Sequence, residues 1–147
     1  LCKKMIVRLI AVGKLKERAT QDWVREFEKR LTKYCTFETI EMKESSKDKE
    51  ADDVLRLLKP DDCVILFDVA GSEFSSEEFA RLLGRQTSKR IVIIIGGPDG
   101  VTDEVRRRAA HRISISRMTF THQIARLLVT EQLYRAFTIL KGEKYHK

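Results

Sequence analysis

The sequence is poor in the residues that build small disulfide-bonded or metal-stabilised proteins. It has three cysteines, an odd number with no Cys-x-x-Cys pair, and three histidines without the spacing of metal ligands. These residues are Cys2, Cys35, Cys63, His111, His122 and His146. A disulfide framework or a zinc site is therefore not expected, and no metal is assigned. Cys63, inside the apolar stretch CVILFDV, is expected to be a small core residue.

Long hydrophobic runs and common phosphate-binding signatures are missing as well. The longest apolar run, residues 91–95, is far too short to cross a bilayer. The N-terminal LCKK is not followed by the apolar segment and cleavage site of a signal peptide, so we expect a cytoplasmic protein without a membrane partner. Neither G-x-G-x-x-G nor G-K-[ST] occurs. At 147 residues, the chain is expected to form a single domain, 1–147, with a core of its own.

The chain carries an excess of positive charge. Its net charge is +7 and its isoelectric point is near 9.5, which favours a polyanionic partner such as nucleic acid. A solubilising surface charge is the alternative. Basic residues are frequent late in the chain, and the candidates for contact with RNA are Arg106, Arg107, Arg108, Lys144 and Lys147.

Strand patterns alternate with helical patterns along the sequence. Strands are predicted at 5–13, 36–44, 62–71, 90–97 and 113–116, and helices at 17–34, 51–59, 75–86, 102–112 and 121–142. This alternation indicates an α/β fold with a mostly parallel sheet and helices on both faces. The almost wholly apolar segment 90–97 belongs in the middle of the sheet. Ligands of such sheets bind beyond the carboxyl ends of the strands.

Two loops at predicted strand ends are unusual. The stretch IIIGGPDG, residues 93–100, holds three of the seven glycines and one of the two prolines. Glycine there permits a tight turn or the close approach of a ligand to the backbone. The second loop, SRMTFTHQ at 116–123, places Met118 and Phe120 before the long helix. They either pack on that helix as a hydrophobic staple or cover a ligand, and an apolar lining suits an adenine ring better than a phosphate.

These stretches together resemble one family. IIIGGPDG, the segment from SISRMTFTHQ to YHK and the opening IVRLIAVGKLKE are similar to the ribosomal large-subunit pseudouridine N3-methyltransferases of the SPOUT class, over nearly the whole chain. The resemblance implies a SPOUT-type fold with a C-terminal deep trefoil knot and a homodimer whose active site lies at the subunit boundary. It also implies S-adenosylmethionine as cofactor and large-subunit rRNA, in the assembled ribosome, as substrate. Met5 matches the family's usual first residue, and no function is assigned to residues 1–4.

The resemblance also carries over the residues of the cofactor site. They are Phe67 and Gly96 at two strand ends, and Ile115, Ser116, Arg117, Met118, Thr119 and Phe120. This chain departs from the family's pattern in three places: leucine is frequent where Phe67 stands, proline is common where Thr121 stands, and the region 45–55 is shorter than in many relatives. The last difference concerns contact with RNA rather than the cofactor.

Three residues are expected to act on the target base. Methyl transfer from a sulfonium needs positioning and a nucleophile that has lost its proton, but no metal. His146 is the candidate base and Tyr145 can stack on the target base, while Arg117 can stabilise negative charge on it. The alternatives are a SPOUT methyltransferase that acts on tRNA and a non-enzymatic RNA-binding module, although nothing like an RNP motif or the GXXG loop of a KH domain is present; the G-x-x-G at residues 97–100 follows a predicted strand.

Overall fold

The computed structural model describes residues 4–147, and residues 1–3, with Cys2, lie outside the described part. The described chain forms a five-stranded sheet in the order β2-β1-β4-β3-β5, in which every neighbouring pair is parallel. The strands are β1 (Ile6–Val12), β2 (Thr36–Met42), β3 (Cys63–Glu73), β4 (Arg90–Ile95) and β5 (His111–Ser114). The predicted α/β class is confirmed. The knot stays a prediction from the resemblance.

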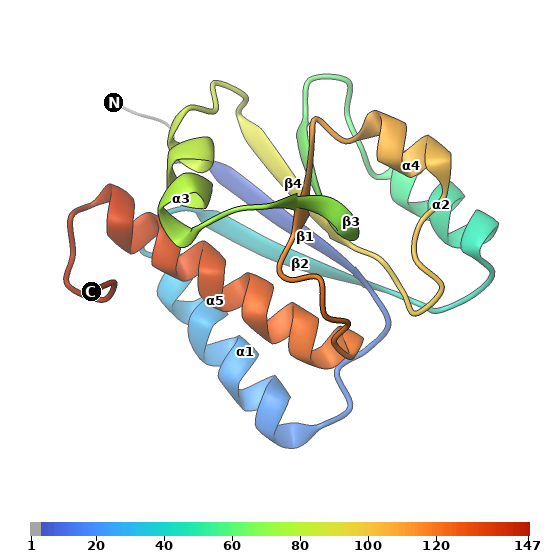
Figure 1. Cartoon of the computed structure of the whole chain (residues 1–147), viewed down its shortest axis with the longest axis horizontal. Helices are drawn as coiled ribbons and strands as arrows, with labels where there is room; N and C mark the ends of the chain where they lie inside the picture. The colour runs from blue at the N-terminus through green and yellow to red at the C-terminus, as the bar shows by residue number, and fades with distance from the viewer. Residues whose placement is uncertain (1–3) are drawn as a thin grey trace.

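Helices cover both faces of the sheet (Figure 1). The first face carries α1 (Arg18–Leu31), α3 (Ser76–Gly84) and α5 (His122–Leu140), whose apolar side chains join one core cluster with the sheet. The second face carries α2 (Lys47–Arg56) and α4 (Asp103–Arg108), which share a second cluster. All six residues of β4 are buried between these layers, as its continuous apolar run predicted.

The predicted helix starts are confirmed by their caps. Ser75 forms a capping box with Glu78, and the Thr121 side chain accepts a hydrogen bond from the Ile124 amide at 3.3 Å. Gly142, with φ +68°, closes α5 as expected. No helix of residues 4–147 is long and apolar enough to cross a membrane.

Two predicted helices differ most clearly from the observed ones. The helix expected at 102–112 ends at Arg108, because the Ala110 amide donates to the Val64 carbonyl at 2.9 Å and the next residues pair with β3 as β5. The helix expected at 51–59 begins earlier, at Lys47, where Ser46 caps it. Residues 47–50 therefore belong to α2.

Strand β3 is longer than predicted and is interrupted beside β5. Its pairing with β5 shifts register between Phe67 and Ser72, so residues 68–71 leave the regular ladder. The two strands lie close together at Gly71, where a Cβ would lie 2.7 Å from the backbone carbon of Arg112. Phe67 thus stands at the break in β3, not at its end. Two of the displaced residues, Asp68 and Val69, line the site described next.

Candidate cofactor site

A crevice lies at the carboxyl ends of β3, β4 and β5. Its larger compartment has a volume of about 450 Å³ and a smaller one of about 90 Å³ adjoins it, since Phe67, Ile95 and Phe120 line both. Volumes of this order are typical of small-molecule sites. Its place agrees with the rule that ligands bind beyond the strand ends of parallel sheets.

The glycine-rich loop after β4 forms the floor of the larger compartment. The Gly100 amide donates to the Gly97 carbonyl at 3.0 Å, and Gly100 takes φ +77°, which favours glycine. A Cβ on Gly96 would lie 2.8 Å from Cγ1 of Val101, inside the loop rather than in the cavity. The loop therefore needs glycine for its own packing, and it presents backbone to the cavity.

The loop before α5 forms the opposite wall and is held by its own hydrogen bonds. Ser114 Oγ donates to the Ser116 carbonyl at 2.7 Å, and the Met118 amide donates to Ser116 Oγ at 3.0 Å. Met118 is 73% exposed and Phe120 is 37% exposed, although both line the crevice. The exposure of Met118 does not fit a staple packed on α5, and it fits a side chain that covers a ligand.

Seven of the eight residues predicted to hold the cofactor line this crevice. Phe67, Gly96, Thr119 and Phe120 line the larger compartment, and Ile115, Ser116 and Met118 line the smaller one. Arg117 is the exception: it is exposed and is not among the lining residues.

The sequence analysis missed several lining residues, among them Asp68 and His122. Burial opposes the charge on the Asp68 carboxylate, but hydrogen bonds from Arg112, the Ala70 amide and Arg106 outweigh it and hold the pKa of Asp68 below its usual value. His122 begins α5, and its buried Nε2 has no hydrogen-bond partner in the described part of the chain. The sequence feature that could have identified His122 as a lining residue is its position directly after the Thr121 cap, at the start of the helix that borders the crevice.

The candidate catalytic residues near the C-terminus lie away from the crevice. Tyr145 donates to Oε1 of Glu131 at 3.0 Å, and the Arg135 guanidinium lies 4.8 Å from the centre of the Tyr145 ring. His146 Nε2 lies 2.7 Å from Oε1 of Glu77. Arg135 stands ten residues beyond Ala125, the last α5 residue lining the larger compartment, which is about 15 Å along the helix axis.

The contacts of His146 indicate one tautomer of its ring. Arg135 Nη1 lies 3.1 Å from His146 Nδ1, and an arginine can only donate, so Nδ1 accepts. The ring proton is then on Nε2, where it is donated to Glu77, and this hydrogen bond lowers the pKa of Glu77. Both ring nitrogens are thus occupied, and His146 has no free lone pair while it holds this position.

The candidate RNA-binding residues differ in their surroundings. Arg106 is paired with Asp68 at 3.1 Å and Asp103 at 2.9 Å, and Arg108 donates to the Lys59 carbonyl at 2.7 Å. The remaining three, Arg107, Lys144 and Lys147, are exposed. No group of three or more His, Cys, Asp or Glu side chains within residues 4–147 is arranged to hold a metal ion.

Comparison with known proteins agrees with this geometry. The family model described as "Predicted SPOUT methyltransferase" matches residues 5–146. The chain belongs to the SPOUT methyltransferase family. It is 44% identical to the ribosomal RNA large subunit methyltransferase H of Caldicellulosiruptor saccharolyticus, over 97% of this chain and 100% of the relative. It is 40% identical to the protein of the same name from Clostridium acetobutylicum, with the same coverage.

Solved structures of more distant proteins share the SPOUT fold. A probable methylase family protein from Haemophilus influenzae aligns with 99% of this chain and 71% of its own, with a TM-score of 0.55 at 14% identity. The SpoU methyltransferase AviRb from Streptomyces viridochromogenes, solved in complex with the cofactor AdoMet, aligns with 98% of this chain and 61% of its own, with a TM-score of 0.52 at 11% identity. At these identities the likeness concerns the fold alone.

Proposed function

We propose that this SPOUT methyltransferase transfers a methyl group from S-adenosylmethionine to N3 of a pseudouridine in large-subunit rRNA, on the assembled ribosome, and that residues 1–147 act as one domain. The relatives covered over their whole length carry the name of a large-subunit rRNA methyltransferase. The observation that carries the proposal is the crevice, which gathers seven of the eight residues expected to hold the cofactor.

The shape and chemistry of the crevice fit S-adenosylmethionine. Phe67, Ile95, Ile115 and Phe120 give one end an apolar lining for an adenine ring. The backbone of the glycine-rich loop and the start of α5 give the other end hydrogen-bonding groups. The bound cofactor supplies an electrophilic methyl group on a sulfonium.

The residues of the chain position the target base and handle its N3 proton. Positioning lowers the barrier by up to ~7–11 kcal/mol in ideal cases. We assign Tyr145 to stacking on the base and His146 to accepting the proton. His146 must first leave Arg135 and Glu77, because both ring nitrogens are occupied in the present position. Arg117 is exposed on the loop that borders the crevice, so it can contact the uracil carbonyls of a base that lies outside the cofactor site.

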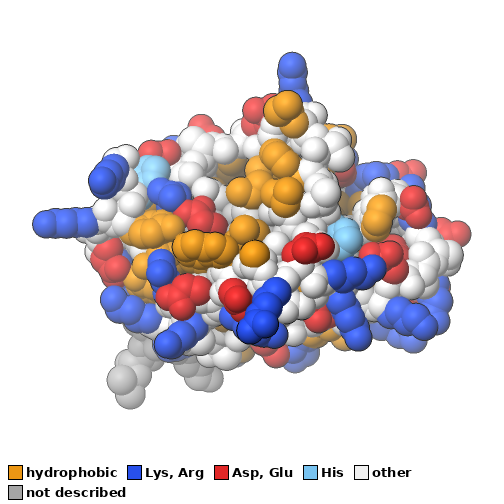
Figure 2. All heavy atoms as spheres, turned by 90° about the horizontal axis from the view of Figure 1, so that it is seen from below, with side chains coloured by type: hydrophobic (Ala, Val, Ile, Leu, Met, Phe, Trp, Pro, Cys, Tyr) orange, Lys and Arg blue, Asp and Glu red, His pale blue; other side chains and the backbone are white. Residues whose placement is uncertain are grey.

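A homodimer brings Tyr145 and His146 to the crevice of the other subunit. In support, Figure 2, which views the side of α1 and α5, shows hydrophobic side chains among charged ones. Trp23 on α1 is 56% exposed, and Ile124 and Leu140 on α5 are 46% and 42% exposed. Exposed apolar side chains of this size mark protein interfaces. Because the substrate is ribosomal RNA, we also propose a cytoplasmic location.

The proposal is tested by incubating the purified protein and labelled S-adenosylmethionine with ribosomes, free rRNA and tRNA from a strain that lacks the enzyme. We expect label in the large-subunit rRNA of assembled ribosomes, and mass mapping should place one methyl group on a pseudouridine. Label in tRNA alone would favour the tRNA methyltransferase. No binding of S-adenosylmethionine in calorimetry would leave only a non-enzymatic RNA-binding module.

A further inference from the structure

A second hollow lies at the carboxyl ends of β1 and β2, on the other side of the start of α5. Its volume is about 420 Å³, and its lining comes from the loop after β1, from α1, from edge strand β2 and from α5. The lining residues are Lys14, Leu15, Gln21, Val24, Arg25, Glu28, Thr39, Glu41 and Arg126. It shares no lining residue with the crevice that we assign to the cofactor.

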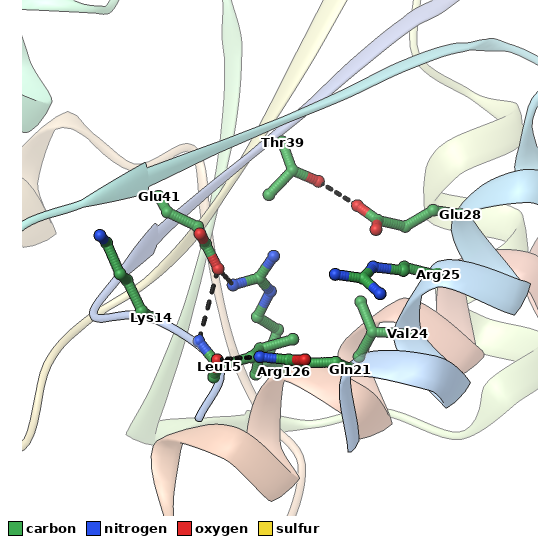
Figure 3. Close-up of a pocket in the computed structure, with 9 residues that line it drawn as sticks. All are labelled: Lys14, Leu15, Gln21, Val24, Arg25, Glu28, Thr39, Glu41 and Arg126. Atoms are coloured by element: carbon green, nitrogen blue, oxygen red, sulfur yellow. Dashed lines mark hydrogen bonds and ion pairs between the residues drawn. The ribbon is translucent and has the colours of Figure 1, made fainter. Parts of the chain in front are cut away.

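The sequence builds this hollow from side chains that face one another across it (Figure 3). Gln21, Val24, Arg25 and Glu28 follow the helical spacing that puts them on one side of α1. The Gln21 side chain donates to the Leu15 carbonyl at 2.6 Å, which ties the loop after β1 to that helix. The walls are therefore preformed.

The carboxylates of the hollow already have partners. Glu41 accepts from the Leu15 amide at 3.4 Å and from Arg126, and Glu28 accepts from the Thr39 hydroxyl. The cations have weaker or incomplete partners: Arg25 is 72% exposed and has only Asp22 at 4.0 Å. Lys14 is exposed. Three cationic and two anionic side chains line the hollow, so the excess charge that faces it is positive.

Arg126 is a buried charge with unused hydrogen-bonding capacity. It is 6% exposed, Glu41 takes its Nη1, and its Nε has no hydrogen-bond partner among the described residues. In Figure 3 the Arg25 guanidinium points toward that of Arg126 across the hollow. Two like charges that face each other are unfavourable until an anion lies between them, and a phosphate accepts from two guanidinium groups at once.

We propose that this hollow binds a phosphodiester group of the RNA backbone next to the target nucleotide, with Arg25, Arg126 and Lys14 as its ligands. The proposal rests on the proposed function for the identity of the RNA. Arg126 lies one helical turn after His122, which lines the cofactor crevice, so the two sites are about 6 Å apart along α5. A phosphate held there fixes the strand on which the target base is carried.

The test compares three variants in steady-state methylation of ribosomes. Arg25→Glu should raise the KM for ribosomes roughly ten- to a hundredfold, because one charge-assisted contact is lost, and leave kcat and the Kd for S-adenosylmethionine near wild type. Glu28→Gln removes a negative charge from the same hollow and should leave the KM unchanged or lower it. Arg81→Glu, an exposed site on α3 with the same charge change as Arg25→Glu, is the matched control and should leave the KM near wild type.

Equal KM values for Arg25→Glu and Arg81→Glu would overturn the phosphate site. A second copy of the chain is the alternative occupant of the hollow, and sedimentation of each variant tests it. If Arg25→Glu changes the oligomeric state and the KM rises with it, the hollow is a contact between copies of the chain. Should the wild type methylate no ribosomes, the proposed function fails. In that case the affinity of the protein for a short single-stranded RNA is measured by fluorescence anisotropy. Equal affinities of wild type and Arg25→Glu would then overturn the phosphate site.

Discussion

Deletion of Tyr145–Lys147 separates the catalytic contribution of this segment from the cofactor site. In its own chain the segment is held on α5 and α3, by the hydrogen bond from Tyr145 to Glu131 and by the contact of His146 with Glu77. None of its three residues lines the crevice. The deletion should therefore leave the Kd for S-adenosylmethionine and the far-ultraviolet circular dichroism unchanged.

Methyl transfer should fall steeply in the same variant. Loss of a proton acceptor costs about 10²–10⁴-fold in rate, and loss of a stacking partner for the base costs about 1–3 kcal/mol in the complex with RNA. Single-turnover measurement with excess ribosomes reports the first effect, and the KM for ribosomes reports the second. Substitution of His146 alone by Gln should reproduce the first effect without the second, since Tyr145 remains.

A mixed dimer shows which subunit receives the segment. One subunit carries Gly96→Val and keeps Tyr145–Lys147, and the other lacks the segment and keeps its crevice. If the segment acts across the boundary, one of the two sites is complete and about half of the wild-type activity returns. A mixed dimer that is verified by native mass spectrometry and yet inactive would refute the cross-subunit arrangement.

Three further outcomes are expected. Gly96→Val should weaken S-adenosylmethionine binding about tenfold or more in calorimetry while the fold persists. The new Cβ would lie 2.8 Å from Cγ1 of Val101, so Val101 and the loop that carries it must move. Undiminished affinity would show that the loop does not belong to the cofactor site. Arg107→Glu should leave that affinity intact and reduce the slope of ribosome binding against log salt by about one, and an unchanged slope would make Arg107 a solvated surface charge. Burial opposes the charge of Asp62, but the Arg90 hydrogen bonds at 2.6 and 2.8 Å lower the pKa of Asp62 in the folded protein. The stability that this ion pair contributes is therefore present above about pH 3.9, the unfolded pKa, and is lost as the pH falls through the lower pKa of the folded state. Asp62→Asn should lower the free energy of unfolding, measured in urea, by about 3–5 kcal/mol at pH 7 and by less at pH 3; an equal loss at both pH values would contradict this.

The fold could be predicted where local chemistry decides it. The apolar run of β4 gave its central place, and the Ser75 and Thr121 caps gave the starts of two helices. Local sequence does not show where α4 ends, because residues 109–112 carry a helical pattern. Their strand structure depends on pairing with the edge of β3, which lies far away in the sequence. The register shift of β3 between Phe67 and Ser72 depends equally on β5, its distant neighbour in sequence.

Prediction of the site followed the same division. The two loops were recognised from glycine content and from apolar side chains placed where a loop should be polar, whereas the individual cofactor residues came from the resemblance to the family. The place of Arg117 outside the crevice lining was beyond the sequence, because the hydrogen bonds of Ser116 that hold this loop are not visible there. The burial of Arg126 was also beyond the sequence, since its partner Glu41 lies 85 residues earlier in the chain.

The first turns of α5 connect these observations. Thr121 caps the helix, His122 faces the cofactor crevice, and Arg126, one turn later, faces the second hollow. Gln123 between them accepts from the amides of Lys16 and Glu17, both at 3.0 Å, so the loop after β1 is fixed to the same turns. One rigid helix start therefore sets the distance between a cofactor and an anion. A change that tilts it, such as Gln123→Ala, should weaken S-adenosylmethionine and ribosome binding together, whereas Arg25→Glu should affect ribosome binding alone.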